Sequence, residues 1–249
     1  MRVELFGAPV DRLTMEQAEE RVAELVRGGR SCRVITLNPE FLYRAVSAEP
    51  LLLELVRRAD LVTADGEGIV WAGRVAGTPF PERVTGIDLM LRLVRRAAAE
   101  GWRVYLLGSA PGVAGEAAAN LQRKYPGLQV AGTHHGYFKP DEEELVVRQV
   151  KQAAPQLLFV ALGAPRQELW IDRHVDRIGP VVAMGVGGSF DVVAGRVARA
   201  PRWMQRMKIE WLGRLIREPS RWRRMLVLPK FAWLVLKTYG FGKRRQRFG

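Results

Sequence analysis

Short runs of apolar residues alternate along most of the chain with longer stretches in which apolar positions recur every three or four residues. The short runs are bounded by Gly, Pro, Asn or Asp, as β-strands are. The predicted strands are Arg33–Leu37, Leu61–Ala64, Arg103–Leu107, Gln129–Ala131, Leu157–Leu162 and Val181–Val186. The predicted helices are Met15–Arg27, Pro39–Arg58, Ile87–Glu100, Val113–Tyr125, Asp141–Ala153 and Arg166–Arg177.

The regular alternation of strands and helices is typical of βαβ units. The run Leu157–Leu162 has no polar position, as expected for a strand whose two faces are both covered by helices. We therefore predict an α/β fold with a mostly parallel, doubly wound sheet and helices on both faces.

The alternation stops near Gly195–Pro201. Beyond this point two segments, Trp203–Leu215 and Ser220–Leu228, have helical character and are separated by a proline. We therefore expect a catalytic α/β domain over residues 1–195 and a helical appendage over residues 196–249.

Charge is distributed unevenly between these two parts. The whole chain has a formal net charge of +13, yet residues 196–249 contain 16 Lys and Arg against 2 acidic residues, and the remainder contains 23 against 24. The appendage is therefore expected to bind an anionic partner, which would be a nucleic acid, an anionic membrane or a diphosphate. A solvated basic tail is the alternative.

The cellular location is constrained by what the sequence lacks. Cys32 is the only cysteine, which excludes an intramolecular disulfide and a cysteine-rich metal site. The N-terminus has no signal-peptide pattern, and no segment is long and apolar enough to span a bilayer. These features predict a cytoplasmic protein, either free or attached to the inner face of the plasma membrane.

Polar or glycine-rich sequence follows four of the predicted strands. The four segments are Thr36–Glu40, Thr63–Gly66, Leu162–Glu168 and Gly185–Asp191. Ligands of doubly wound sheets bind at the carboxyl ends of the strands, so four such segments together predict a pocket at that edge.

Three side chains near these strand ends are suited to sugar chemistry. Asp65 could accept the proton of a sugar hydroxyl as that hydroxyl attacks another sugar, and capping the next helix is its alternative role. Thr36 and Asn38 are short polar groups suited to sugar hydroxyls or a phosphate, although Asn38 is equally suited to cap the helix that begins at Pro39.

Two glycine-containing segments, Gly163–Glu168 and Gly185–Ser189, resemble loops whose backbone N–H groups approach a diphosphate, with tight turns as the alternative. Neither has the P-loop or the dinucleotide-binding pattern. Adjacent His134 and His135 make a poor metal pair, and the nearby Tyr137 either stacks on a base or packs in its loop. Because the chain has no Asp-x-Asp, we expect no metal and no cofactor, with diphosphate charge balanced by arginines and helix N-termini.

Four arginines of the appendage fall within about 80° of one helical face when the helix is taken as continuous. They are Arg214, Arg217, Arg221 and Arg224. Arginine matches phosphate geometry in a bidentate way, and a solvated face is the alternative. The apolar stretch Leu226–Leu236, with its Trp and flanking Lys, is typical of a helix in a membrane interface, and docking onto a partner subunit is its alternative.

Several strings of the sequence resemble the WecG/TagA/CpsF family, which is glycosyltransferase family 26. They are TLNPEF, TADGEGIVWA, ERVTGIDL, GYF, LGAPRQELWI and GVGGSFDVVAGRVARAPRWMQRMKIEWLGRLIREPSRWRR, and they run from residue 36 to residue 224. The resemblance implies a Rossmann-like α/β core, a membrane-targeting appendage, and inverting, metal-independent transfer from a UDP-sugar. In one branch the donor is UDP-N-acetylmannosamine, the acceptor is N-acetylglucosamine on undecaprenyl diphosphate, and the product is the linkage unit of wall teichoic acid.

The resemblance also implies roles for single residues. Asp65 matches the family's proposed base, which removes the proton from the acceptor's 4-hydroxyl group. The residues that match substrate-binding positions are Thr36, Asn38, Arg83, Gln167, Arg214, Arg221 and Arg224. The candidates for the nucleotide are Tyr137, Gly187, Gly188 and Asp191.

The expected partners are a UDP-sugar, an undecaprenyl-diphosphate-linked acceptor and an anionic membrane surface, and not nucleic acid. UDP-N-acetylmannosaminuronic acid and UDP-glucose are alternative donors within the family. The alternatives outside it are a nucleic-acid-binding protein that uses the basic appendage and a sugar-nucleotide sensor without turnover. Exposed apolar surface on a detached appendage predicts self-association. If the appendage closes the site at a membrane, deleting residues 196–249 should abolish transfer and leave the core folded.

Overall fold

The computed structural model describes residues 1–201, 204, 207 and 226–240. Six strands form one parallel sheet in the order β4-β3-β8-β7-β5-β6. They are β3 (Cys32–Leu37), β4 (Leu61–Ala64), β5 (Arg103–Gly108), β6 (Gln129–His134), β7 (Leu157–Ala161) and β8 (Val182–Gly185). The predicted α/β fold with a parallel sheet is confirmed, and the arrangement is Rossmann-like.

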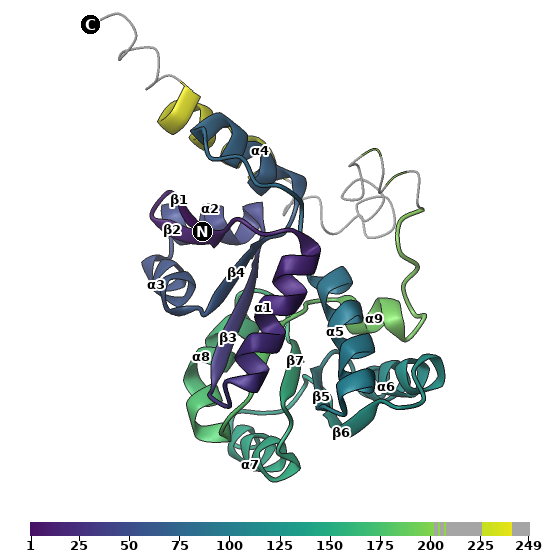
Figure 1. The fold of residues 1–249 in the computed structure, drawn as a ribbon. Coiled ribbons are helices and arrows are strands. Elements are labelled where there is room, and N and C mark those ends of the chain that lie inside the picture. The colour runs from purple at the N-terminus through teal and green to yellow at the C-terminus, as the bar shows by residue number, and fades with distance from the viewer. Residues whose placement is uncertain (202–203, 205–206, 208–225, 241–249) are drawn as a thin grey trace, which may run out of the picture.

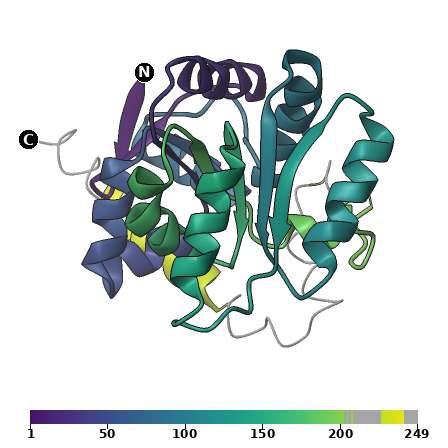
Figure 2. The ribbon, with the colours of Figure 1, turned by 90° about the horizontal axis from the view of Figure 1, so that it is seen from below.

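Helices cover both faces of the sheet (Figures 1 and 2). One face carries α1 (Met15–Arg27), α5 (Gly86–Glu100) and α6 (Val113–Lys124), and the other carries α2 (Pro39–Ser47), α3 (Pro50–Arg58), α7 (Glu143–Ala153) and α8 (Arg166–Ile178). Phe159 of β7 packs with the first layer and its neighbour Val160 with the second, and neither side chain is exposed. A strand buried on both faces must be apolar at every position, which explains the uninterrupted run in the sequence.

One predicted helix is divided in the structure. The sequence pattern predicted a continuous helix over Pro39–Arg58, but α2 ends at Ser47 and α3 begins at Pro50. Pro50 has no N–H with which to continue the ladder of α2, and its fixed φ suits the first turn of a new helix. The two helices pack against each other as a consequence.

An N-terminal hairpin that was not predicted precedes the sheet. It pairs β1 (Arg2–Leu5) with β2 (Ala8–Asp11) in antiparallel fashion. Both turn residues have positive φ, 54° at Phe6 and 77° at Gly7, as a two-residue hairpin turn requires. At this turn the Phe6 ring and backbone N–H contact residues 231 and 239.

The last described segment consists of α13 (Val227–Val235) and a π-helix over Leu236–Gly240, and it packs on α2 and α4 (Glu67–Ala76). In Figure 1 this segment, in yellow, lies alongside α4. Phe231 is 2% exposed and belongs to the core cluster that includes α2 and the hairpin. Phe6 N–H donates to Tyr239 Oη at 2.7 Å, and the Phe6 and Phe231 ring centroids are 6.3 Å apart. Burying a phenyl group contributes about 2 kcal/mol.

Residues 227–240, which the sequence analysis assigned to the appendage, thus share a hydrophobic core with the α/β domain. Deletion of residues 196–249 would uncover the apolar surface beneath Phe231. The deletion would therefore destabilise the α/β domain as well as remove the appendage. The predicted helix Trp203–Leu215 and most of the predicted helix Ser220–Leu228 lie outside the described residues. Within the described part of the chain, no helix has the length and apolar character needed to cross a membrane.

Two bidentate ion pairs fix the chain where the short helix α9 (Ser189–Val193) ends. Arg196 binds Glu116 of α6 at 2.6 and 2.8 Å, and Arg199 binds Asp88 of α5 at 2.6 and 2.8 Å. Burial raises the pKa of Asp88, but hydrogen bonds from Arg199 and Thr85 outweigh it and hold this pKa below its usual value. The segment that follows α9 is therefore anchored at the first turn of α5.

Candidate active site

The four strand ends with polar or glycine-rich sequence lie side by side. β4, β3, β8 and β7 are consecutive neighbours in the parallel sheet, so their carboxyl ends meet at one edge. The chain passes from β5 outward to β6 but from β7 back to β8, so neighbouring strands β5 and β7 connect in opposite directions. In doubly wound folds, ligands bind at the carboxyl ends of the strands beside such a reversal.

Asp65 lies directly after β4 and is held by backbone groups of two other elements. Its own N–H donates to Leu37 O at 2.8 Å, and its Oδ2 accepts from Gly86 N–H at 3.1 Å. The N-cap of the following helix is Gly66, so the alternative that Asp65 caps this helix is wrong. Its carboxylate instead meets the first residue of α5, where helix N–H groups favour negative charge.

Thr36 shares this position. Its hydroxyl donates to Gly185 O at 3.4 Å. A Cβ atom placed on Gly86 would lie 3.2 Å from Thr36 Oγ1 and 3.6 Å from Asp65 Oδ2. The start of α5 therefore lies close to the ends of β3 and β4. Because Gly86 has no side chain, there is room at this point for the side chains of Thr36 and Asp65.

Asn38 and Arg83 have protein partners. Asn38 Oδ1 accepts from Phe41 N–H at 2.9 Å, which confirms that Asn38 caps α2, while a contact of its amide with substrate stays a prediction. Arg83 lies 3.8 Å from Glu67 Oε1, and a fifth of its side chain is exposed. It also lines a cavity of about 370 Å³ together with Thr85 and residues of the outer side of α5. Neither Asp65 nor Thr36 lines that cavity.

Gln167 is buried, with 4% of its surface exposed, and both ends of its amide are engaged. Its Nε2 donates to Glu168 Oε1 at 2.8 Å, and its Oε1 accepts from Gly187 N–H at 3.0 Å. Gln167 therefore joins the start of α8 to the loop after β8. A direct contact of Gln167 with substrate stays a prediction.

Glu168 is a buried carboxyl that the sequence analysis did not single out. Its Oε2 atom has no hydrogen-bond partner among the residues that the structure describes. Burial raises the pKa of Glu168 to about 7, although the hydrogen bonds from Gln167 and from its own backbone N–H act in the opposite direction. Position along the sequence gives no sign of this burial, because an acidic residue in the first turn of a helix is usually exposed.

The nucleotide candidates gather at β5 and β8. Asp191 Oδ2 accepts from Ser109 Oγ at 3.2 Å, and Ser109 O accepts from Gly136 N–H at 2.8 Å. Gly136 precedes Tyr137, whose side chain is 73% exposed, so the alternative of a packed loop aromatic is wrong. The ring is accessible to a base, and stacking stays a prediction.

Ser109 is a further residue that the sequence analysis missed. It has a φ of +58°, which is uncommon for a residue other than glycine, and it lies between Gly108 and a proline-containing turn at the end of β5. Strained backbone of this kind is often retained at functional sites. The string Gly108–Gly112 after a predicted strand was the available signal.

The structure thus brings Asp65 and Thr36 together. Gly185 links this pair to Gln167 and Gly187. Separately, Asp191 is joined through Ser109 to the loop that carries Tyr137. Gly188 follows Gly187 as the N-cap of α9. Arg214, Arg221 and Arg224 lie outside the described residues. No group of three or more His, Cys, Asp or Glu side chains suited to a metal ion occurs in the described part of the chain.

Stability is expected to fall as pH rises from about 5 to about 8 because of Glu168. The pKa of Glu168 is 4.5 in an exposed reference state and about 7 in the fold, so between these two values only the folded chain keeps the proton. The loss is complete above the folded-state pKa and is on the order of 3 kcal/mol. The charged groups beside Glu168 are Arg33 and Asp172, which pair with each other at 3.2 Å.

Urea unfolding of the wild type and of Glu168→Gln between pH 5 and 8 measures this effect. The variant has no proton to lose, so its free energy of unfolding should fall less over the window. Parallel curves for the two proteins would contradict the assignment.

Comparison with known proteins identifies the family. The sequence model described as Glycosyl transferase WecG/TagA/CpsF family matches residues 3–246. A Bacillus spizizenii protein named N-acetylglucosaminyldiphosphoundecaprenol N-acetyl-beta-D-mannosaminyltransferase is 38% identical over 82% of this chain and 78% of that protein. A Staphylococcus aureus (strain MW2) protein of the same name is 34% identical over 95% of this chain and 93% of that protein. The chain therefore belongs to the glycosyl transferase WecG/TagA/CpsF family.

Proposed function

We propose that this chain transfers N-acetylmannosamine from UDP-N-acetylmannosamine to N-acetylglucosamine on undecaprenyl diphosphate, with inversion and without a metal ion. The names of the relatives specify the acceptor and the transferred sugar for those proteins. The observation that carries the proposal is the position of Asp65 at the end of β4, oriented by Gly86 N–H and beside the Thr36 hydroxyl.

In the proposed reaction Asp65 accepts the proton of the acceptor's 4-hydroxyl group. The hydroxyl oxygen then forms a bond to the anomeric carbon of the donor from the face opposite UDP. The bond between that carbon and the diphosphate oxygen breaks, and UDP leaves with the electron pair. Transfer in a single displacement inverts the anomeric configuration.

The charge of the departing diphosphate needs cations. The chain contains no Asp-x-Asp pair of the kind that holds a divalent ion on a sugar nucleotide. Arg83, whose side chain lies 3.8 Å from Glu67 at the start of α4, is one candidate, and Arg214, Arg221 and Arg224 are the others. The backbone around Gly187 and Gly188, with Asp191 and Tyr137, is proposed to bind the nucleotide.

We also propose that the protein attaches to the inner face of the plasma membrane through α13. Leu226, Trp233 and Leu236 are 50%, 61% and 41% exposed, whereas Phe231 on the same helix is buried. Lys237 Nζ lies 5.0 Å from the Trp233 ring centroid. An exposed Trp and Leu surface with adjacent lysines suits the interface of an anionic bilayer.

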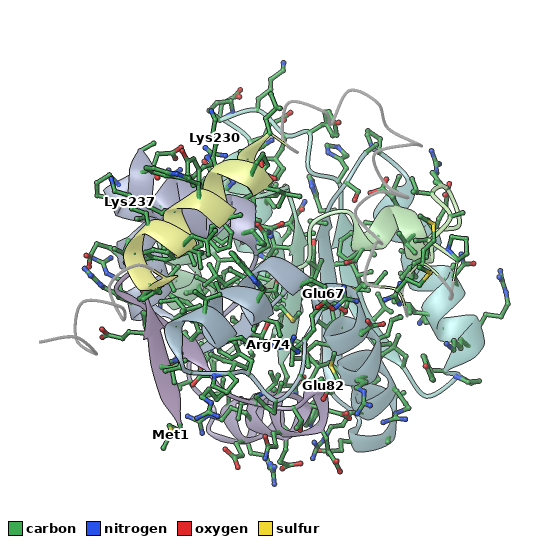
Figure 3. The ribbon with its side chains drawn as sticks, turned by 90° about the horizontal axis from the view of Figure 1, so that it is seen from above. Met1, Glu67, Arg74, Glu82, Lys230 and Lys237 are labelled. Atoms are coloured by element: carbon green, nitrogen blue, oxygen red, sulfur yellow. The ribbon has the colours of Figure 1, made fainter. Side chains whose placement is uncertain are left out.

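The buried side of α13 packs next to the start of α4, the helix that follows the proposed base. Figure 3 shows Lys230 and Lys237 along α13 and Glu67, the first residue of α4, toward the middle of the same view. Phe231 Cε1 is 3.7 Å from the position of a Cβ on Gly68, in the first turn of α4. One helical turn therefore separates the docked α13 from Asp65, which suits an acceptor that is anchored in the membrane.

The substitution Asp65→Asn tests the proposed function. The amide oxygen of the asparagine side chain can still accept from Gly86 N–H but cannot take up the proton, so the acceptor-dependent release of UDP should fall at least ~100-fold. The dissociation constant for UDP should stay within about twofold, since the nucleotide candidates are elsewhere. Release of UDP is measured with a short-chain prenyl-diphosphate N-acetylglucosamine acceptor and, in parallel, with each of the three candidate donors.

Asp141→Asn, at an exposed aspartate before α7, is the matched control and should keep full activity. Wild-type turnover retained by Asp65→Asn would exclude Asp65 as the base. A wild type that binds UDP but never releases it from any donor would indicate a sensor, and binding of DNA without UDP would indicate a nucleic-acid-binding protein.

Reversing the charge of Lys230 and Lys237 to Glu tests the membrane surface. Each basic residue contributes about 1 kcal/mol on an anionic leaflet, so the partition coefficient onto phosphatidylglycerol vesicles should fall at least ~tenfold. The control is the same reversal of Arg148 and Lys151, which are exposed on α7. If both double variants sediment equally with the vesicles, total charge and not α13 determines binding.

A further inference from the structure

Glu168 occupies a position where a carboxyl is costly. The residue is 5% exposed, its Oε1 accepts from Gln167 Nε2, and its Oε2 has no partner in the described part of the chain. A buried polar atom without a hydrogen bond destabilises the fold, so an apolar residue would be favoured there by stability alone. The hydrogen bond to Gln167 is what the carboxyl supplies.

That hydrogen bond determines which way the Gln167 amide faces. Gln167 is buried, so its two ends need partners within the protein. With Nε2 bound to Glu168, Oε1 faces Gly187 N–H at 3.0 Å. Without this acceptor, Nε2 would be a buried donor without a partner, and any rotation of the amide toward another partner would weaken the hydrogen bond from Gly187 N–H.

The loop after β8 is shaped around these two side chains. Gly187 has a φ of +52°, which favours glycine. A Cβ on Gly185 would lie 2.5 Å from Gln167 Nε2 and 3.0 Å from Glu168 Oε1. Only glycine at this position lets the end of β8 lie so close to these two side chains. Gly185 O also accepts from Thr36 Oγ1, which joins the loop to the Asp65 cluster.

We propose that Glu168 is a positioning residue for the donor nucleotide, because it fixes the Gln167 amide that holds the Gly187–Gly188 backbone in the shape that binds the diphosphate of UDP. The inference rests on the proposed function, in which this loop contacts the nucleotide. Successive backbone N–H groups of a turn form a concave site for anions, and its affinity depends on how well the turn is fixed.

The test compares Glu168→Ala with Glu168→Gln in the full chain. Alanine removes the acceptor for Gln167 Nε2, so the dissociation constant for UDP, measured by calorimetry, and KM for the donor should both rise at least ~tenfold. Glutamine keeps an acceptor oxygen at the same distance and should restore both values to within about twofold of wild type. KM for the acceptor should not change in either variant.

Trp170→Phe is the matched control. Trp170 is on the same helix, is also buried, and its Nε1 likewise has no partner in the described part of the chain, but it packs in the cluster between α7 and α8. The substitution Trp170→Phe should leave the affinity for UDP unchanged. All measurements are made well below the melting temperature of each variant, where the protein is folded. If Glu168 had only a structural role, Glu168→Ala would lower the melting temperature but would not change the affinity for UDP.

Unchanged UDP affinity in folded Glu168→Ala would overturn the inference, and so would a Glu168→Gln variant as weak as Glu168→Ala. These outcomes differ from a failure of the proposed function, in which the wild type itself would not bind UDP.

Discussion

The hydrogen bond from Gly86 N–H to Asp65 Oδ2 connects the end of β4 to the start of α5, and the candidate active site depends on it. Twenty residues separate Asp65 from Gly86 along the chain, and only the fold brings them together. The donor is the first N–H of a helix, which has no partner within the helix, and the Asp65 carboxylate supplies one. The absence of a side chain on Gly86 then lets Thr36 approach the same point.

The N-terminal hairpin and the segment 227–240 are joined beside α4, the helix that follows Asp65. The Phe6 turn of the hairpin binds Tyr239, and Phe231 fills the core between α2 and α4, both of which begin at strand ends that form the site. The exposed side of α13 is thereby held at a fixed position relative to Asp65. If α13 is the membrane contact, as proposed, that contact would also set the orientation of the strand ends that carry Asp65 and Thr36.

The sequence predicted the sheet because strands covered on both faces must be apolar throughout. It predicted the site at the strand ends because polar or glycine-rich sequence follows four strands, where ligands of doubly wound sheets bind. The break between α2 and α3 had a signal in Pro50 that helical periodicity concealed. The hairpin was missed because its strands have four residues each, too few for alternation to stand out.

The packing of α13 could not be predicted from the sequence, because Trp, Leu and Lys at helical spacing suit a membrane interface and a protein core equally. The structure shows that the helix uses one side for the core, with Phe231 and Val235, and leaves the other side exposed. Glu168 is buried against β3 and the end of β8, which are far away in the chain, so no local pattern contains its burial. For the positive φ of Ser109 the only local signal was the glycines on either side of it, Gly108 and Gly112.

The most direct measurement is a crystal structure of the full chain with UDP and a short-chain prenyl-diphosphate N-acetylglucosamine. If Asp65 is the base, one of its carboxylate oxygens will lie within hydrogen-bond reach of the acceptor 4-hydroxyl group, roughly 2.6–3.2 Å, with UDP on the side of β5 and β8. An acceptor hydroxyl bound beyond the reach of Asp65, or a nucleotide seated in the cavity along the outer side of α5, would contradict the account.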